Sequence, residues 1–164
     1  MITARNTKTL SKCRFWFAST IVLCALVMGC AASLTAATGA PVPIEHSEYL
    51  AVDSAKLFLM TRGADRRTPV LLWLHGGPGG AERPLFRYFN SDLEDNFVVA
   101  YWDQRGAGRS FDLDADPHSL TIARHLADLD VVVDHLRQSL DQDKIVLVGH
   151  SWGTALGLLY AQAH

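Results

Sequence analysis

One glycine-bracketed segment constrains the fold of this chain more than any other feature. Gly149-His150-Ser151-Trp152-Gly153 fits the pattern G-x-S-x-G. The run before it, Lys144–Val148, predicts a buried strand, and the run after it, Thr154–Ala161, predicts a helix. A serine on so sharp a strand-to-helix turn is presented at the carboxyl end of a sheet, and the N–H of the next residue is free to bind an oxyanion. The pattern therefore predicts that Ser151 is a nucleophile.

The first forty residues differ in composition from the rest. Four cations precede Phe15, no charged residue occurs from Phe15 to Ala32, and small residues continue to Ala40. A positive start, an apolar stretch and a small-residue region are typical of a secretory signal peptide. The apolar stretch is also long enough to cross a bilayer as an uncleaved anchor. We therefore interpret residues 1–40 as a signal peptide or a membrane or lipid anchor, which predicts an exported protein: periplasmic, secreted or membrane-anchored.

A possible acylation site lies within this leader. Val27–Cys30 resembles a bacterial lipobox, in which the cysteine is acylated and becomes the first residue. Met28 is not a favoured residue there, and ordinary cleavage within residues 31–40 is the alternative. Cys30 is therefore a candidate for lipidation. All three cysteines lie in the leader, so residues 41–164 are predicted to contain no disulfide and no thiolate metal site.

The charge balance argues against a nucleic-acid partner. Four of the 15 Lys and Arg residues lie in the leader, which leaves eleven against 17 Asp and Glu, a net charge of −6 with neutral histidines. Proteins that bind nucleic acids are typically basic. The histidines show no metal-ligand spacing, so neither a metal nor an organic cofactor is expected. Membrane contact is expected only through the N-terminal segment, and the sequence leaves the oligomeric state open.

The residues after the leader predict strands that alternate with helices. Strands are predicted at Tyr49–Val52 and Lys56–Thr61, which form a hairpin, and at Val70–Leu74, Phe97–Tyr101 and Lys144–Val148, which are buried on both faces. Helices are predicted at 84–94, at 120–140 and after the G-x-S-x-G segment. This order predicts an α/β fold with an initial β-hairpin and a mostly parallel, doubly wound sheet covered by helices on both faces.

Residues 120–140 carry the clearest helical pattern. Their apolar residues step by three and four and form one stripe: Ile122, Leu126, Leu129, Val133, Leu136 and Leu140. Thr121 or Ser119 is the candidate N-cap. The charged residues Asp128, Asp134 and Arg137 are expected on other, solvated faces of the helix.

Three loops follow the three buried strands: His75–Gly80, Trp102–Ser110 and the G-x-S-x-G segment. In an open α/β sheet the carboxyl ends of the parallel strands form the binding crevice, so the three loops should converge there. Their glycines allow backbone N–H groups to approach a ligand without interference from a Cβ.

These loops carry a resemblance to a known family. His75-Gly76-Gly77-Pro78-Gly79, Asp103-Gln104-Arg105-Gly106 with Gly108 and Ser110, and Ser151-Trp152 are the residues that carry it. Residues 45–164 resemble the amino-terminal half of the α/β-hydrolase fold and, within it, the serine peptidases that include the proline iminopeptidases. One departure is His150, because proline iminopeptidases usually have glycine before the serine.

The resemblance implies a reaction. An acyl-enzyme on Ser151 would release N-terminal residues, often proline, from small peptides. The N–H groups of Gly77 and Trp152 would form the oxyanion hole, whose donors typically contribute a few kcal/mol to the transition state. An esterase or other acyl hydrolase of the same fold is the alternative within this class. A non-catalytic, membrane-tethered binding protein with a hydrolase-like fold is the alternative of another class.

The resemblance also implies supporting roles for the loop residues. His75 and Pro78 would brace the first loop, and the Gly77–Pro78 bond is a candidate for the cis form, which proline permits at small cost. Asp103 and Arg105 would lock the second loop by a charged hydrogen bond. The strand-to-helix turn Gly149–Gly153 is called the elbow. His150 is expected to pack under this elbow and to point away from the serine hydroxyl.

The order of catalytic residues in this fold predicts that partners of Ser151 are missing here. That order is Ser, then Asp or Glu, then His. No acidic residue follows Ser151, and His164 lies roughly 20 Å along the same helix, whereas proton transfer needs about 3 Å. We therefore expect a fragment that is truncated before the lid and the last strands and is inactive by itself. The truncation also predicts an uncovered edge on the last strand and leucines without neighbours on the last helix: Leu156, Leu158 and Leu159.

Overall fold

The computed structural model describes residues 39–164, of which residues 41–164 form one compact unit. The predictions made for the leader, including the signal peptide or anchor and the lipidation of Cys30, lie outside the described residues. Within residues 39–164 no helix is long and apolar enough to cross a membrane.

The described part begins with a long β-hairpin. Strand β1 (Ile44–Val52) pairs with β2 (Ala55–Gly63) in antiparallel register, and Val52 lies opposite Ala55. Asp53 occupies the turn with a left-handed φ of 51°. The predicted hairpin is confirmed, and its strands are longer than the apolar runs suggested. The added residues of β1 are mostly exposed, as expected for an edge strand, so no apolar run marks them.

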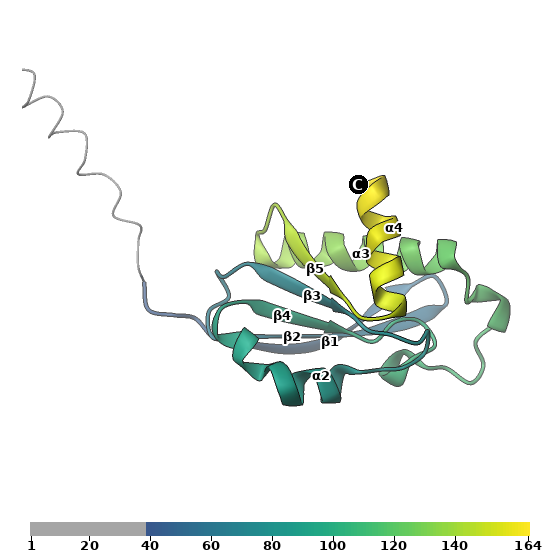
Figure 1. The fold of residues 1–164 in the computed structure, drawn as a ribbon, viewed down its shortest axis with the longest axis horizontal. Coiled ribbons are helices and arrows are strands. Elements are labelled where there is room, and N and C mark those ends of the chain that lie inside the picture. The colour runs from purple at the N-terminus through teal and green to yellow at the C-terminus, as the bar shows by residue number, and fades with distance from the viewer. Residues whose placement is uncertain (1–38) are drawn as a thin grey trace, which may run out of the picture. The chain divides into compact units, whose positions relative to one another are not determined.

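The sheet of the described residues has the order β1-β2-β4-β3-β5 (Figure 1). Strands β4 (Val98–Trp102), β3 (Val70–Leu74) and β5 (Ile145–Gly149) run parallel to one another, while β2 joins β4 in the antiparallel sense. The sheet is therefore mixed, with the hairpin at one edge and β5 at the other. This arrangement confirms the α/β fold.

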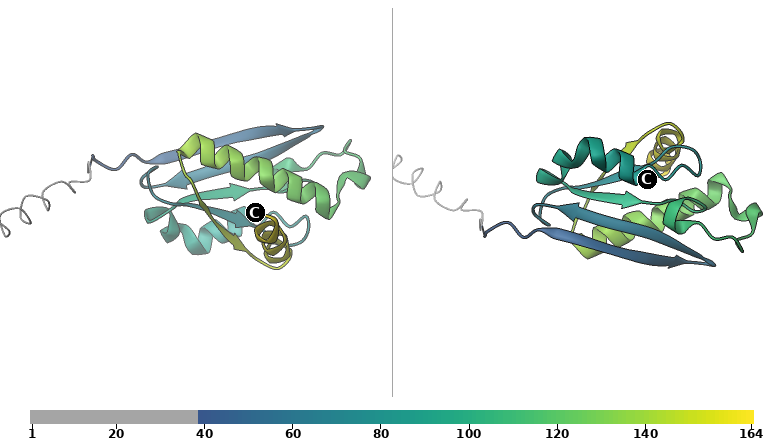
Figure 2. Two further views of the ribbon diagram at one scale, coloured as in Figure 1. Left: turned by 90° about the horizontal axis from the view of Figure 1, so that it is seen from above. Right: turned by 90° about the horizontal axis from the view of Figure 1, so that it is seen from below.

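Helices cover both faces of the sheet (Figures 1 and 2). Helices α3 (Ile122–Leu140) and α4 (Trp152–Ala163) lie on one face, and α2 (Arg83–Asn90) lies on the other. Short 3₁₀ helices lie in the connections: η1 (Ser91–Asp95), η2 (Gly108–Ser110) and η3 (Pro117–Ser119). The doubly wound arrangement is therefore also confirmed.

The two faces bury cores of unequal size. The larger core joins inward-facing residues of the strands to α3 and α4, and its fully buried members include Leu57, Leu72, Leu74, Val98, Leu129 and Leu156. The smaller core under α2 contains Leu71, Val99 and Tyr101. There Phe86 stacks on Trp73, with ring centroids 3.7 Å apart.

Helix α3 follows most of the predicted pattern, and two of its residues differ from the prediction. Thr121 caps its start by accepting a hydrogen bond from the N–H of Arg124 at 3.2 Å, as predicted. Asp128, expected on a solvated face, is fully buried, whereas Ile122, expected in the stripe, is 52% exposed. The expectation for Asp128 was wrong because a buried arginine from another loop reaches it, and helical spacing carries no information about such a partner.

The burial of β5 and α4 agrees only in part with the predictions made for them. Strand β5 pairs with β3 on one side, and within residues 39–164 no strand pairs with its other side, which leaves Val146 44% exposed. Leu158 and Leu159 of α4 are 62% and 40% exposed, as expected. The prediction was wrong for Leu156, which is fully buried because it shares the sheet-facing side of α4 with Gly153 and Tyr160.

Candidate functional site

Ser151 lies on the sharp turn between β5 and α4, and its side chain is exposed. Its backbone has φ 50° and ψ −116°, a conformation that costs energy for any residue with a Cβ. Such strain persists only where the surroundings enforce it. The strand and the helix predicted on either side of Ser151 are both confirmed.

Two glycines enforce this turn. A Cβ on Gly153 would lie 2.0 Å from the carbonyl oxygen of Leu74, and a Cβ on Gly149 would lie 2.6 Å from the backbone of Gly153. No other residue fits at either position without displacing backbone. The N–H of Gly153 donates to the carbonyl of His150 at 2.8 Å, which closes the turn. The pattern G-x-S-x-G is thus required by the close approach of β5, α4 and β3.

The loop after β3 lies directly against the serine. A Cβ placed on Gly76 would be 3.2 Å from the Cβ of Ser151. Gly77 has a φ of +115°, which favours glycine, and the Gly77–Pro78 peptide bond is cis, as the sequence led us to expect. Within residues 39–164 the N–H of Gly77 donates no hydrogen bond. A backbone donor without a partner among the described residues is therefore available one residue after Gly76, where this loop approaches the serine.

His75 is enclosed beneath this loop. Its Nδ1 lies 2.9 Å from the carbonyl oxygen of Gly76, and its Nε2 accepts a hydrogen bond from the N–H of Gln104 at 2.9 Å. These partners require a neutral ring with the proton on Nδ1. Burial, the largest influence, lowers the pKa of His75 below its ordinary value. Both ring nitrogens are used, so this geometry favours a bracing role over a catalytic one.

Gln104 joins all three loops, a role that the sequence did not assign to it. Its Nε2 donates to the carbonyl of His75 at 2.9 Å, and its Oε1 accepts a hydrogen bond from the indole of Trp152 at 3.0 Å. The side chain is 1% exposed. Its position between Asp103 and Arg105 was the available signal, but only the fold shows that its amide faces both neighbouring loops.

Asp103 and Arg105 lock the second loop through separate partners. Asp103 accepts a hydrogen bond from the N–H of Arg109 at 2.9 Å. Arg105 reaches out of the loop to Asp128 of α3 and makes two hydrogen bonds, of 2.6 and 2.8 Å, which raise the pKa of its guanidinium. The pair with Asp128 is almost completely buried. Arg105 therefore fastens the loop to the helix layer.

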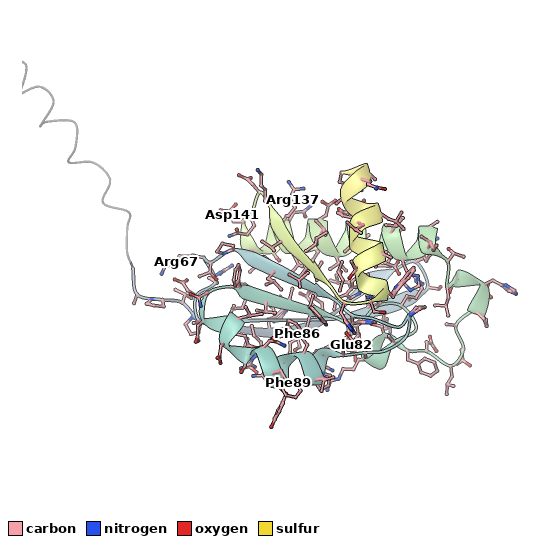
Figure 3. The ribbon with its side chains drawn as sticks, in the orientation of Figure 1. Arg67, Glu82, Phe86, Phe89, Arg137 and Asp141 are labelled. Atoms are coloured by element: carbon pink, nitrogen blue, oxygen red, sulfur yellow. The ribbon has the colours of Figure 1, made fainter. Side chains whose placement is uncertain are left out.

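His150 does not pack under the elbow, and that expectation was wrong. Its side chain is 62% exposed, and its Nδ1 lies 2.9 Å from Oε1 of Glu82. Glu82 precedes α2 and lies between the starts of α2 and α4 (Figure 3). The sequence did not signal Glu82 as the partner of His150, because the chain separates them widely and the pairing depends on how the loop after β3 folds back.

His164 lies at the opposite end of α4 from Ser151. Its ring stacks on Tyr160, with centroids 4.2 Å apart, and its Nε2 is 3.7 Å from a carboxylate oxygen of Asp130. Among residues 39–164 no histidine is hydrogen-bonded to the Ser151 hydroxyl.

The same residues contain no group of His, Cys, Asp and Glu side chains arranged to hold a metal ion.

Comparison with known proteins places this geometry in context. A family model described as "alpha/beta hydrolase fold" matches residues 69–164. The Bacillus subtilis protein named "Probable aminopeptidase YbaC" is 39% identical over 109 residues, which cover 66% of this chain and 34% of that protein. A proline iminopeptidase of Xylella fastidiosa is 35% identical over 122 residues, covering 74% of this chain and 36% of that protein.

A solved structure shows the same arrangement. The proline iminopeptidase-related protein of Thermus thermophilus superposes with a TM-score of 0.62 at 32% sequence identity, over 73% of this chain and 40% of that protein. The chain thus spans about a third of the length of the curated relatives it matches.

Proposed function

This chain belongs to the α/β-hydrolase fold family, and from that premise we propose that it carries the nucleophile and the oxyanion-binding loop of a serine hydrolase with aminopeptidase activity. The observation that carries the proposal is the exposed Ser151 on its strained turn beside the unused N–H of Gly77. The aminopeptidase and proline iminopeptidase relatives favour a peptide substrate over a simple ester.

The proposed reaction begins with attack of the Ser151 hydroxyl oxygen on the carbonyl carbon of the substrate. The N–H groups of Gly77 and Trp152 then bind the negative oxygen of the tetrahedral intermediate, where one such donor is typically worth about 2.7–4 kcal/mol. Release of the amine leaves an acyl-enzyme on Ser151, and water hydrolyses it. The hydroxyl proton must pass to a base at about 3 Å, and in this proposal the complete gene product supplies that base.

The test uses the full-length gene product. A fluorophosphonate probe should label Ser151, and Ser151→Ala should abolish labelling and lower kcat by several orders of magnitude while the fold is kept. Ser139→Ala, a change of an exposed serine on α3, is the matched control and should leave both unchanged. Full activity in Ser151→Ala would eliminate the nucleophile assignment.

Substrate class is tested with the same protein. Proline-β-naphthylamide and p-nitrophenyl acetate report peptidase and esterase activity, respectively. A higher kcat/KM for the amide supports the aminopeptidase, and turnover of the ester alone supports the esterase. Absence of labelling and of turnover with both compounds would favour the non-catalytic binding protein.

We also propose that residues 1–40 direct export, on the strength of their cations, apolar stretch and small-residue region. Residues 1–45 fused to a reporter that is active only outside the cytoplasm should give an active reporter. Cytoplasmic retention of the fusion would contradict export. Loss of lipid labelling in Cys30→Ser would support the lipoprotein form, and no labelling of the parent would support ordinary cleavage.

A further inference from the structure

The carboxylate of Glu82 bridges two segments that the proposed reaction has to hold together. Its Oε2 accepts a hydrogen bond from the N–H of Gly76 at 3.1 Å, and its Oε1 lies 2.9 Å from Nδ1 of His150. Gly76 precedes the oxyanion donor of Gly77, and His150 precedes the nucleophile Ser151. Because an ionised carboxylate can only accept hydrogen bonds, Nδ1 of His150 carries the proton.

The groups around this bridge are in close contact. A Cβ on Gly76 would lie 2.8 Å from Oε1 of Glu82, 3.1 Å from Nδ1 of His150 and 3.2 Å from the Cβ of Ser151. The space beside Gly76 in the loop after β3 is therefore bounded by the bridging carboxylate, its histidine partner and Ser151. A movement of the carboxylate would displace the loop relative to the serine.

Because the two side chains are partly exposed, loss of the pair should change the position of the loop more than it changes the stability of the fold. The side chain of His150 is 62% exposed and that of Glu82 is 23% exposed. Exposed pairs of this kind contribute little to the free energy of unfolding. The core, the elbow glycines and Gln104 hold the fold in any case, so loss of the pair would leave the fold intact and free the segment that includes Gly76.

We propose that Glu82 and His150 form a clasp that sets the spacing between the oxyanion donor of Gly77 and the nucleophile elbow. The two residues are positioning residues and touch no reacting atom, and the inference rests on the proposed function of Ser151. The two oxyanion donors belong to different segments and must each lie about 2.7–3.1 Å from the developing oxyanion. A displacement of about 1 Å in such geometry can cost about 100-fold in rate.

Three variants of the full-length protein test the clasp. In Glu82→Gln a single amide oxygen replaces two carboxylate oxygens, so only one of the two donors can keep its acceptor. His150→Ala removes one arm, whereas His150→Asn keeps an N–H donor on a short side chain. Asp92→Asn, which alters an exposed carboxylate just after α2, is the matched control.

We expect Glu82→Gln and His150→Ala to lower kcat for the Ser151-dependent reaction by about 10–100-fold, with KM nearly unchanged. His150→Asn should recover most of the loss, and Asp92→Asn should match the wild type. A double variant that combines Glu82→Gln with His150→Ala should lose no more activity than either single variant. In parallel, amide hydrogen exchange of residues 76–80 should be faster in Glu82→Gln and His150→Ala, while the melting temperature changes little.

The outcomes separate this inference from the function on which it rests. Ser151-dependent turnover with an unchanged kcat in Glu82→Gln and His150→Ala would overturn the clasp and leave the nucleophile in place. A loss of activity that His150→Asn does not restore, without faster exchange at residues 76–80, would also overturn it. Absence of any Ser151-dependent labelling or turnover in the wild type would overturn the proposed function, and the clasp with it.

Discussion

The loops after β3 and β4 and the elbow after β5 meet at one end of the sheet but are held in different ways. In the two loops His75, Gln104 and Arg105 are each at most 5% exposed, and their polar atoms are hydrogen-bonded. At the elbow, Ser151 and His150 are exposed, and β5 lies at the sheet edge.

This difference teaches that the two halves of the proposed chemistry are pre-organised by different means. Burial and paired polar groups fix the base of the loop that carries Gly77, the proposed oxyanion donor. Backbone packing at Gly149 and Gly153 fixes the turn that carries Ser151, the proposed nucleophile, and the contact of Glu82 with His150 joins this turn to the loop. Substitutions in the buried pairs should therefore mainly lower the free energy of unfolding. Substitutions at the elbow should mainly displace Ser151 and lower its reactivity.

The largest effect is expected from breaking the buried pair of Arg105 and Asp128. Asp128→Ala leaves the guanidinium buried without its partner, which typically costs about 3–5 kcal/mol. Asp134→Ala, which removes a carboxylate from an exposed position of the same helix, should cost at most about 0.5 kcal/mol. Urea denaturation of both variants measures the difference.

Replacing both partners sharpens this test. The double variant Arg105→Met with Asp128→Leu removes both charges and should recover most of the lost stability, because apolar replacement of a buried pair is often neutral. Equal stability of Asp128→Ala and Asp134→Ala would show that burial of the pair does not hold the second loop.

A smaller loss is expected from filling the space at the elbow. In Gly153→Ala the new methyl group would lie 2.0 Å from the Leu74 carbonyl oxygen, so β3 and α4 must separate. Such overpacking typically costs about 1–3 kcal/mol, and the displaced turn should also slow fluorophosphonate labelling of Ser151. Gly157→Ala on the same helix meets only the flexible end of a leucine side chain at 3.1 Å and should be nearly neutral. Equal melting temperatures and labelling rates in the two variants would refute the packing argument.

Sequence patterns predicted the backbone of the site better than its polar contacts. Apolar runs located every strand, and the G-x-S-x-G pattern located the elbow, because glycine spacing and hydrophobic period reflect local backbone geometry. The partners of Asp128 and His150 were not predictable in this way. Each contact joins residues far apart in the chain, Arg105 with Asp128 and Glu82 with His150, and no local period encodes such a pairing.

The prediction that Lys144–Val148 is buried on both faces was wrong for a related reason. The run Ile145–Val148 is apolar throughout, and such a run predicts burial on both faces. How far a strand is covered depends on which elements pack against it in the assembled sheet of order β1-β2-β4-β3-β5, and an apolar run alone does not carry that information. The prediction for Leu156 was wrong because the turn at Ser151 decides which side of α4 faces the sheet, and the sequence of the helix does not show this.

A moderate, pH-dependent effect is expected from His75. Burial lowers the pKa of its imidazole from the ordinary 6.5, so the folded state binds fewer protons than the unfolded state below that pH. The stability contributed by the neutral ring is therefore complete above about pH 6.5 and is lost as the pH falls towards the lowered pKa. In His75→Asn this loss cannot occur, so the stability gap between wild type and variant should narrow from pH 7.5 to pH 5. A gap that is constant across this range, measured by urea midpoints, would mean that the ring is not held neutral by burial.

The smallest effect is expected on the outer side of α4. Leu158 is 62% exposed and Leu156 is fully buried, although they lie two positions apart on the same helix. Leu156→Ala removes a side chain packed against β3 and should cost about 2–5 kcal/mol, whereas Leu158→Ala should change the unfolding free energy of the 164-residue chain by no more than about 0.5 kcal/mol. Urea denaturation of the two variants provides the measurement, and a cost for Leu158→Ala close to that for Leu156→Ala would contradict the placement of α4.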